Sequence, residues 1–260
     1  MVSTTREPDR QSDQLSATQA AFNFSPWANL PLPVPESRPS NREVITEIGA
    51  GERIVAALAI IGLSPLMLLI ALAIKIECPR GSIFYQQERV GLDRRRASNV
   101  PASEGGADQR QRAGVGRPFR IWKFRTMIPD AELKTGPVWA AENDPRVTRL
   151  GRNLRLLHLD EIPQFFNILA GQMKLIGPRP EREHFIRQFS EEIPAYTERL
   201  KVLPGITGLA QVEREYDSDE DDVKTKLKYD LFYVKNRSRI LDLKILIKTL
   251  DVVLHRRGAH

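Results

Sequence analysis

Cysteine and histidine are scarce in this chain of 260 residues. Its single cysteine, Cys78, excludes an intramolecular disulfide and a cysteine-rich metal centre. Two of the four histidines fall within the last six residues, so a histidine-ligated zinc site is not expected either. A hard metal ion held by carboxylates and phosphate oxygens remains compatible with this composition.

The chain also lacks an internal repeat and the basic start and apolar core of a cleavable signal peptide. Residues 1–45 are instead rich in polar residues, proline and charge, with too little apolar surface to offset the entropy lost on ordering. We therefore predict a disordered tail over 1–45. A flexible loop is predicted over the Gly-, Ser- and Arg-rich residues 94–117, and a basic tail over 255–260.

The charge is unbalanced, with a formal net value of +6. Such a balance suits an anionic partner, which could be nucleic acid, anionic lipid or a phosphorylated substrate. Residues 1–53 carry more acidic than basic side chains, so the positive excess lies further along the chain, beside apolar segments. No nucleic-acid recognition motif is found there, and we therefore expect membrane lipids and phosphates rather than nucleic acid as partners.

One hydrophobic segment, residues 54–74, carries no charged side chain. A helix of about 21 residues is long enough to cross a hydrocarbon core about 30 Å thick. Ser64 and Pro65 lie at its midpoint, where proline removes a backbone donor and kinks a helix. The segment therefore either spans the membrane or enters and leaves on the same face, and the residues alone favour spanning. The positive-inside rule places the part of the chain that follows in the cytoplasm.

Short segments of β-like composition, residues 82–85 and 119–124, are expected to pair as a hairpin. Residues 149–169 follow a helical pattern that is broken near Pro163. If a helix begins close to Asp160, that proline lies in its first turn, where it is tolerated, and the carboxylate lies at the helix N-terminus.

Further along, the pattern over residues 181–199 predicts another helix, and the glycines and proline of residues 204–208 predict a turn-rich loop. That loop either shapes a turn or lets the backbone approach a phosphate. Residues 213–222 are acidic and predicted to be solvated. Residues 240–254 form an amphipathic helix with a broad apolar face, which packs in the core or lies on the membrane interface.

Asp160 and Glu161 are the adjacent pair of residues that most strongly indicates chemistry. Neighbouring carboxylates repel each other, and a bound cation or an acid/base task can offset that cost. A surface salt bridge would explain any isolated pair of this kind. Here arginines recur before the pair, up to Arg155, and the segment 177–180 (GPRP) follows it. Carboxylates bracketed by arginines on a basic, membrane-seeking chain point to reactions of phosphates.

Several segments together resemble the bacterial sugar transferases that act as monotopic polyprenyl-phosphate phosphoglycosyl transferases. They are residues 81–91 (GSIFYQQERVG), 123–127 (KFRTM), 155–164 with the Asp-Glu pair, 177–180, 196–199, 204–208, 210–212, 229–230 and 241–244 (LDLK). The resemblance covers roughly residues 50–254, and so many segments in a fixed order make a specific match. It departs from the usual pattern at Ser82, where proline is usual, at His158, where a small hydroxyl residue is usual, and at Leu209, where tryptophan is frequent.

The resemblance implies an α+β, mostly helical fold and a catalytic domain, residues 79–254, on the cytoplasmic face of the inner membrane. Residues 46–78 would be a re-entrant helix broken at Ser64 and Pro65, which replaces the spanning interpretation, and amphipathic helices would lie at the interface. The implied reaction transfers a sugar 1-phosphate from a UDP-sugar to polyprenyl phosphate and releases UMP. A homodimer is among the arrangements it allows.

The site residues follow from the same resemblance. Asp160 would be the nucleophile that forms a covalent phosphosugar intermediate, and Glu161 would position Mg²⁺ or deprotonate the lipid phosphate, so that both are also metal ligands. The substrate-binding candidates are Arg155, Arg179, Lys123, Arg125, Arg199 and Gln211. Arginine's planar fork suits phosphate.

Structural roles remain open for several candidates. Lys123 and Arg125 could anchor the fold at the membrane surface, Arg199 could pair with Glu198 or with the acidic segment, and Arg155 could orient the carboxylate pair. Two other functions also remain open. One is a single-step transfer without a covalent intermediate, and the other is an inactive membrane-tethered assembly protein that has kept the fold.

Overall fold

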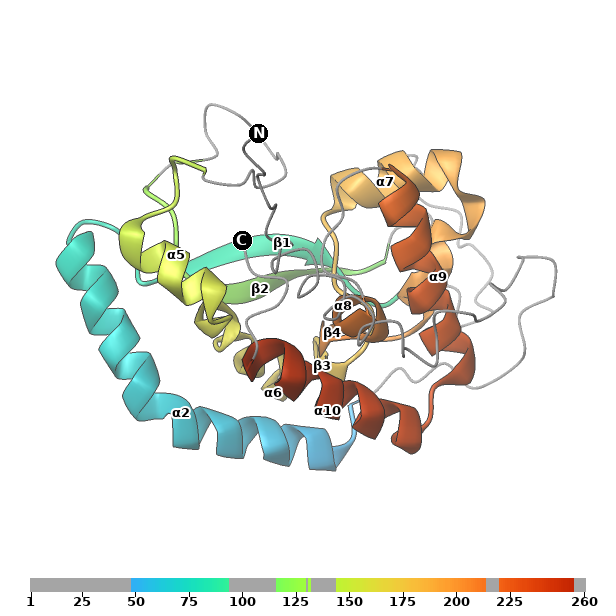
Figure 1. Cartoon of the computed structure of the whole chain (residues 1–260), viewed down its shortest axis with the longest axis horizontal. Coiled ribbons are helices and arrows are strands. Elements are labelled where there is room, and N and C mark those ends of the chain that lie inside the picture. The colour runs from blue at the N-terminus through green and yellow to red at the C-terminus, as the bar shows by residue number, and fades with distance from the viewer. Residues whose placement is uncertain (1–47, 94–115, 130, 132–143, 214–219, 255–260) are drawn as a thin grey trace, which may run out of the picture. The chain divides into compact units, whose positions relative to one another are not determined.

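The structure is a computed structural model that describes residues 48–93, 116–129, 131, 144–213 and 220–254. The predictions made for the tails 1–45 and 255–260, for most of the 94–117 loop and for most of the acidic segment 213–222 lie outside these residues. Helices dominate the described part, together with two small two-stranded sheets (Figure 1). The prediction of a mostly helical α+β fold is confirmed in this respect.

The first helix, α2 (Ala50–Glu77), contains the predicted hydrophobic segment and continues through Pro65. Proline cannot donate a backbone hydrogen bond to the carbonyl of residue 61. The Ser64 hydroxyl donates to that Ile61 carbonyl instead, at 2.7 Å, so the acceptor is satisfied at the interruption. Figure 1 shows the two arms of α2 running in different directions. By length and composition α2 is able to cross a membrane, and the predicted re-entrant insertion stays a prediction.

The predicted hairpin is confirmed. Strand β1 (Phe84–Val90) pairs antiparallel with β2 (Pro118–Phe124), and Phe84 lies opposite Phe124. The rings of these two residues stack with their centroids 5.3 Å apart. Phe124 is buried together with Ile70 and Ile74 of α2, so apolar burial fixes the second arm of α2 against the sheet. The strand end that carries Lys123 is held in place by this packing.

Helix α5 (Arg149–Leu156) begins at Thr148, whose hydroxyl accepts a hydrogen bond from the Gly151 amide at 2.9 Å. It is followed by the short 3₁₀ turn η1 (Leu159–Glu161) and by α6 (Gln164–Leu169). A short 3₁₀ helix thus begins next to Asp160, but the α-helix considered from the sequence, with Pro163 in its first turn, begins only at Gln164. Pro163 precedes α6 as its N-cap, and the carboxylate pair lies in η1, before that helix.

Strands β3 (Lys174–Ile176) and β4 (Gly205–Thr207) pair in parallel, so the loop predicted over residues 204–208 contains a strand. Its glycines serve close backbone packing. A Cβ atom on Gly205 would lie 2.1 Å from the Gly177 nitrogen, and one on Gly208 would lie 2.2 Å from the Gly177 oxygen. The glycines therefore let this loop approach the GPRP segment. The phosphate contact considered from the sequence stays a prediction.

The helix predicted over residues 181–199 is divided. Helix α7 (Glu183–Glu192) ends before Pro194, and the 3₁₀ helix η2 (Pro194–Lys201) starts on that proline, which cannot continue the hydrogen-bonding pattern of α7. A short helix α8 (Leu209–Glu213) and a long helix α9 (Glu220–Asn236) follow. Residues of α7, η2 and α9 share one buried apolar cluster with Val90 of β1.

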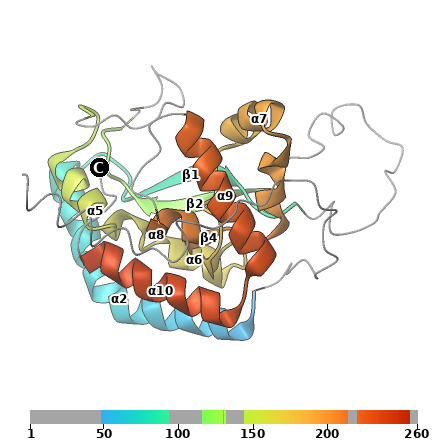
Figure 2. The same ribbon diagram turned by 45° about the vertical axis from the view of Figure 1, so that its right-hand side comes forward.

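The last helix, α10 (Arg239–Leu254), confirms the predicted amphipathic segment. Leu241 and Ile245 are buried, whereas a stripe at helical spacing is exposed, made up of Ile240, Leu243, Ile247, Leu250 and Leu254. Both views show α10 running alongside the N-terminal arm of α2 (Figure 2). Helix α2 exposes large apolar side chains as well, among them Leu58, Ile61 and Leu68. The two helices therefore carry an unusual amount of exposed apolar surface.

Candidate active site

Asp160 and Glu161 are nearly buried, and cations from two other segments reach them. Lys123 at the end of β2 donates through Nζ to Glu161 Oε1 at 2.6 Å and lies 3.7 Å from Asp160 Oδ2. Arg179 from the GPRP segment donates to the same Glu161 Oε1 at 2.7 Å and to its Oε2 at 3.4 Å. The structure thus brings together four of the residues proposed from the sequence.

The two carboxylates differ in their surroundings. Glu161 is engaged by two cations, whereas the Asp160 carboxylate accepts no hydrogen bond from any residue that the structure describes. Burial raises the pKa of Asp160 above its ordinary value, and the nearby Lys123 opposes that effect. Burial acts on Glu161 in the same direction, but Arg179 and Lys123 outweigh it and hold the Glu161 pKa well below its usual range. One member is therefore fixed as an anion, and the other has oxygen lone pairs to offer.

Arg179 is held in place by a buried group of charged residues behind it. Arg199 donates to the Arg179 carbonyl at 3.0 Å, and Arg89 of β1 donates to the Pro180 carbonyl at 3.1 Å. Glu181 accepts from Lys226 of α9 at 2.9 Å. Prolines restrict the backbone on both sides of Arg179, and these contacts fix the segment that carries it.

Arg199 was proposed from the sequence as a substrate-binding residue. Its side chain is 2% exposed and lies 2.7 Å from the Asp230 carboxylate of α9. It also donates to the Tyr196 hydroxyl at 2.9 Å, while Glu198, the partner considered from the sequence, pairs with Lys201. Its contact with the Arg179 carbonyl holds the backbone that carries Arg179, and the predicted substrate role of Arg199 stays a prediction.

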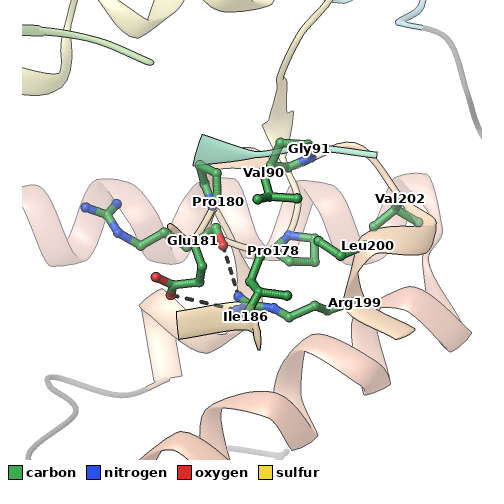
Figure 3. A pocket seen from close by; sticks show the side chains of 11 residues that line it. Val90, Gly91, Pro178, Pro180, Glu181, Ile186, Arg199, Leu200 and Val202 are labelled. Atoms are coloured by element: carbon green, nitrogen blue, oxygen red, sulfur yellow. Dashed lines mark hydrogen bonds and ion pairs between the residues drawn. The ribbon is translucent and has the colours of Figure 1, made fainter. Parts of the chain in front are cut away.

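The same group encloses a small cavity of about 10 Å³, lined by Pro178, Pro180, Arg199 and Val202 among others (Figure 3). Figure 3 shows the Arg199 side chain directed toward the Glu181 carboxylate. A space of this size accommodates about one water molecule. It therefore belongs to the packing behind Arg179 and is too small for a substrate.

Arg155 approaches the carboxylates from α5. Its Nε donates to the Thr126 hydroxyl at 2.9 Å, and its two terminal nitrogens have no partner among the described residues. The charge of Arg155 lowers the Asp160 pKa, which places it within electrostatic reach. The close contact between α5 and the segment that follows β2 depends on Gly151, where a Cβ atom would lie 2.1 Å from the Thr126 carbonyl oxygen. The Arg155 guanidinium is therefore held through Nε, and its terminal nitrogens are available to a ligand.

Two further candidates are engaged elsewhere. Arg125 donates to the Ser82 hydroxyl, at the turn that follows α2. Gln211 of α8 donates to the Ile206 carbonyl at 3.1 Å, next to the glycine-rich loop. These contacts fit the alternative that Arg125 supports the fold, and the predicted substrate role of both residues stays a prediction.

Glu181, Asp230, Arg89 and Lys226 were not singled out by sequence reasoning. Three signals were available, because Glu181 directly follows the GPRP segment, Asp230 lies within the matched residues 229–230 and Arg89 lies within the matched residues 81–91. These residues are distinguished by being buried, and a buried charged group requires a partner. The sequence does not reveal whether a single charged residue is buried.

A metal site can be assessed from the donor set. Within residues 48–93, 116–129, 131, 144–213 and 220–254, no three His, Cys, Asp or Glu side chains converge on one point. Asp160 and Glu161 supply two carboxylates beside each other. Magnesium is commonly held by one or two protein carboxylates with substrate phosphates and water completing its shell, so this pair fits Mg²⁺ bound together with a phosphorylated substrate.

Comparison with known proteins agrees with the site. A model of the bacterial sugar transferase family matches residues 49–100 and 104–256. The chain belongs to this family. The resemblance recognised from the sequence is therefore confirmed, and the buried carboxylates with their cations lie within the matched region.

Several curated relatives carry names that specify a reaction. A UDP-N-acetylgalactosamine-undecaprenyl-phosphate N-acetylgalactosaminephosphotransferase from Aeromonas hydrophila is 44% identical over 213 residues, covering 82% of this chain and 45% of the relative. A UDP-glucose:undecaprenyl-phosphate glucose-1-phosphate transferase from Klebsiella pneumoniae is 38% identical, with 76% and 38% covered. A UDP-galactose-lipid carrier transferase from Erwinia amylovora is 35% identical, with 80% and 40% covered. The chain spans less than half the length of each of these relatives.

Proposed function

We propose that this sugar transferase chain moves a sugar 1-phosphate from a UDP-sugar to undecaprenyl phosphate and releases UMP. The observation that carries the proposal is the contrast within the carboxylate pair. Asp160 is buried with a raised pKa, its oxygens accept no hydrogen bond from the described residues, and it stands among Lys123, Arg155 and Arg179. A raised pKa makes the ionised carboxylate a better nucleophile, and the cations offset the repulsion between it and an anionic diphosphate.

The reaction then proceeds in two displacements. An Asp160 oxygen attacks the β-phosphorus of the UDP-sugar, the bond from that phosphorus to the bridging oxygen breaks, and UMP leaves with the bridging oxygen. An oxygen of undecaprenyl phosphate next attacks the same phosphorus, and Asp160 leaves as a carboxylate. Glu161 is paired with two cations, so it gathers Lys123 and Arg179 at the diphosphate. The arrangement supports this role better than that of a base.

Mg²⁺ belongs to the proposal as a cofactor. Asp160 and Glu161 would hold it, and when bound it would neutralise negative charge on the transferred phosphate. The terminal nitrogens of Arg155 would hold a donor phosphate in the fork geometry that suits a guanidinium. The relatives' names specify different sugars, which are N-acetylgalactosamine, glucose and galactose. The sugar that this chain transfers must therefore be identified by experiment.

A membrane setting is also proposed. Exposed apolar stripes on α2 and α10 would enter the lipid, with the charged site above them at the cytoplasmic face of the inner membrane. A re-entrant α2, bent at Pro65, would keep both ends of that helix on the same side. In this setting the site would lie where a soluble nucleotide sugar meets a lipid phosphate. The product would enter exopolysaccharide or other glycan assembly.

The test measures UMP release by the full chain in nanodiscs with Mg²⁺, undecaprenyl phosphate and UDP-N-acetylgalactosamine, UDP-glucose or UDP-galactose. Asp160→Asn is compared with Asp251→Asn, a matched change on the exposed part of α10. We expect lipid-dependent UMP release from one donor, abolished by the first change and retained with the second. Without lipid, the wild type should release one UMP per site and gain the mass of a phosphosugar. UMP release that survives Asp160→Asn would exclude this nucleophile, and folded protein silent with all donors would favour an assembly role.

A further inference from the structure

His158 has a backbone conformation that no other described non-glycine residue shares. Its φ is 53° and its ψ is 18°, in the left-handed region. Side chains with a Cβ atom adopt this region at a cost, and β-branched residues rarely do so. Helices often end in this conformation, usually on glycine. Here it occurs on a histidine two residues before Asp160.

The hydrogen bonds of His158 join the two halves of the site. Its amide donates to the carbonyl of Arg155 at 3.0 Å, and its own carbonyl accepts from the amide of Glu161 at 3.3 Å. The peptide groups of a phosphate-binding candidate and of the carboxylate pair are thus linked through one residue. A change of φ at this residue would rotate η1 relative to α5 and move Asp160 relative to Arg155.

The imidazole makes a smaller contribution to this arrangement. Its Nε2 is buried and has no hydrogen-bond partner among the residues that the structure describes. The described contacts of His158 that reach the site are therefore made by its backbone. A variant that lacks the ring but accepts the left-handed conformation preserves them.

We propose that His158 is a positioning residue of the transfer reaction, whose left-handed backbone sets the Arg155 guanidinium against the Asp160 carboxylate. The inference rests on the proposed function, because it assigns Asp160 and Arg155 to the first displacement. Strain held at a turn between two reacting groups is a means of fixing their geometry. Misplacement of reacting groups by about 1 Å can cost about a hundredfold in rate.

The test uses three variants that all lack the imidazole. Glycine and asparagine accept a left-handed backbone, whereas valine resists it. The full chain in nanodiscs is mixed with a reactive UDP-sugar and no lipid acceptor, and the single burst of UMP is followed in time. The amplitude of the burst counts correctly folded sites, and its rate reports how the reacting groups are placed.

We expect His158→Gly and His158→Asn to keep the burst rate within about threefold of the wild type. His158→Val should lower the rate by about a hundredfold at an unchanged amplitude. In an Arg155→Ala background the valine change should have little further effect, because the residue it positions is gone. A merely structural role would lower the amplitude and leave the rate of the remaining sites unchanged.

Three results overturn the assignment. Equal loss of rate in all three variants would show that the imidazole acts. An unchanged burst rate in all three variants would show that the backbone conformation does not matter. If His158→Val lowered only the burst amplitude, the role of His158 would be structural. A wild type without a burst, by contrast, overturns the covalent step of the proposed function, and the present assignment falls with it. These outcomes differ in the wild-type trace, so the two failures are distinguishable.

Discussion

Glu181→Gln tests whether the buried charges behind Arg179 stabilise the fold. Burial acts to raise the Glu181 pKa, but Lys226, Arg199 and Arg89 outweigh it and lower the pKa from 4.5 to about 2. The difference corresponds to about 3 kcal/mol of free energy that favours the ionised carboxylate in the folded chain. Glutamine has nearly the same shape and no charge, so the variant should lose about that much free energy of unfolding at neutral pH.

The pH dependence has a definite sign. A carboxylate whose pKa is lowered by folding contributes stability above its unfolded pKa and loses that contribution as the pH falls. For Glu181 the loss runs from about pH 4.5 to about pH 2. The difference in stability between wild type and Glu181→Gln should therefore be full at pH 7 and narrow progressively over this acidic window.

The assay is thermal and urea unfolding of the full chain in nanodiscs. A loss of about 3 kcal/mol should lower Tm by roughly 6–12 °C for a domain of this size. Glu183→Gln is the matched control, because Glu183 pairs with Arg187 one helical turn away and both side chains are 34% exposed or more. Such surface pairs contribute about 0–1 kcal/mol.

Equal stability of Glu181→Gln and Glu183→Gln at pH 7 would show that the buried charges behind Arg179 do not stabilise the fold. A stability deficit of Glu181→Gln that is unchanged well below pH 4.5, where the wild-type carboxylate is losing its charge, would show the same. A further consequence concerns the site. Glu181 helps to fix the segment that carries Arg179, so its variant should also release UMP more slowly than the control does.

Two more predictions concern packing and the membrane. Gly151→Ala would place a Cβ atom 2.1 Å from the Thr126 carbonyl oxygen and should lower the free energy of unfolding by about 3 kcal/mol. Gly51→Ala is the control, because no atom lies within 4 Å of its Cβ position, and it should cause no loss. Urea unfolding compares the two variants. Ile247 is 59% exposed on α10, so in a Cys78→Ser background a polarity-sensitive dye on Ile247→Cys should shift to the blue in nanodiscs. The same dye on Glu192→Cys, exposed at the end of α7, should stay in a watery environment, and equal spectra at the two positions would argue against lipid contact by α10.

Local patterns predicted the elements whose causes are local. The hydrophobic run became α2, the β-like segments became the β1–β2 hairpin, and the amphipathic segment became α10, because periodicity and burial act within each segment. The boundaries that failed lie at turns that the helical pattern does not reveal. Pro163 suited a first helical turn, but the left-handed turn at His158 ends the preceding helix and leaves the carboxylate pair in a turn of its own.

The candidate site divides in the same way. Asp160, Glu161, Lys123 and Arg179 were proposed from the sequence, and the structure brings all four together. Arg199 has the same chemistry as Arg179, and no pattern separated them. The difference lies in their partners, because Asp230 of α9 and Tyr196 of η2 enclose Arg199, whereas Arg179 projects to Glu161. A buried cation must be paired within the protein, so we expect a guanidinium enclosed in this way to support the position of its neighbour. Which arginine fills which role is decided by α9, a helix that lies far from both in the sequence.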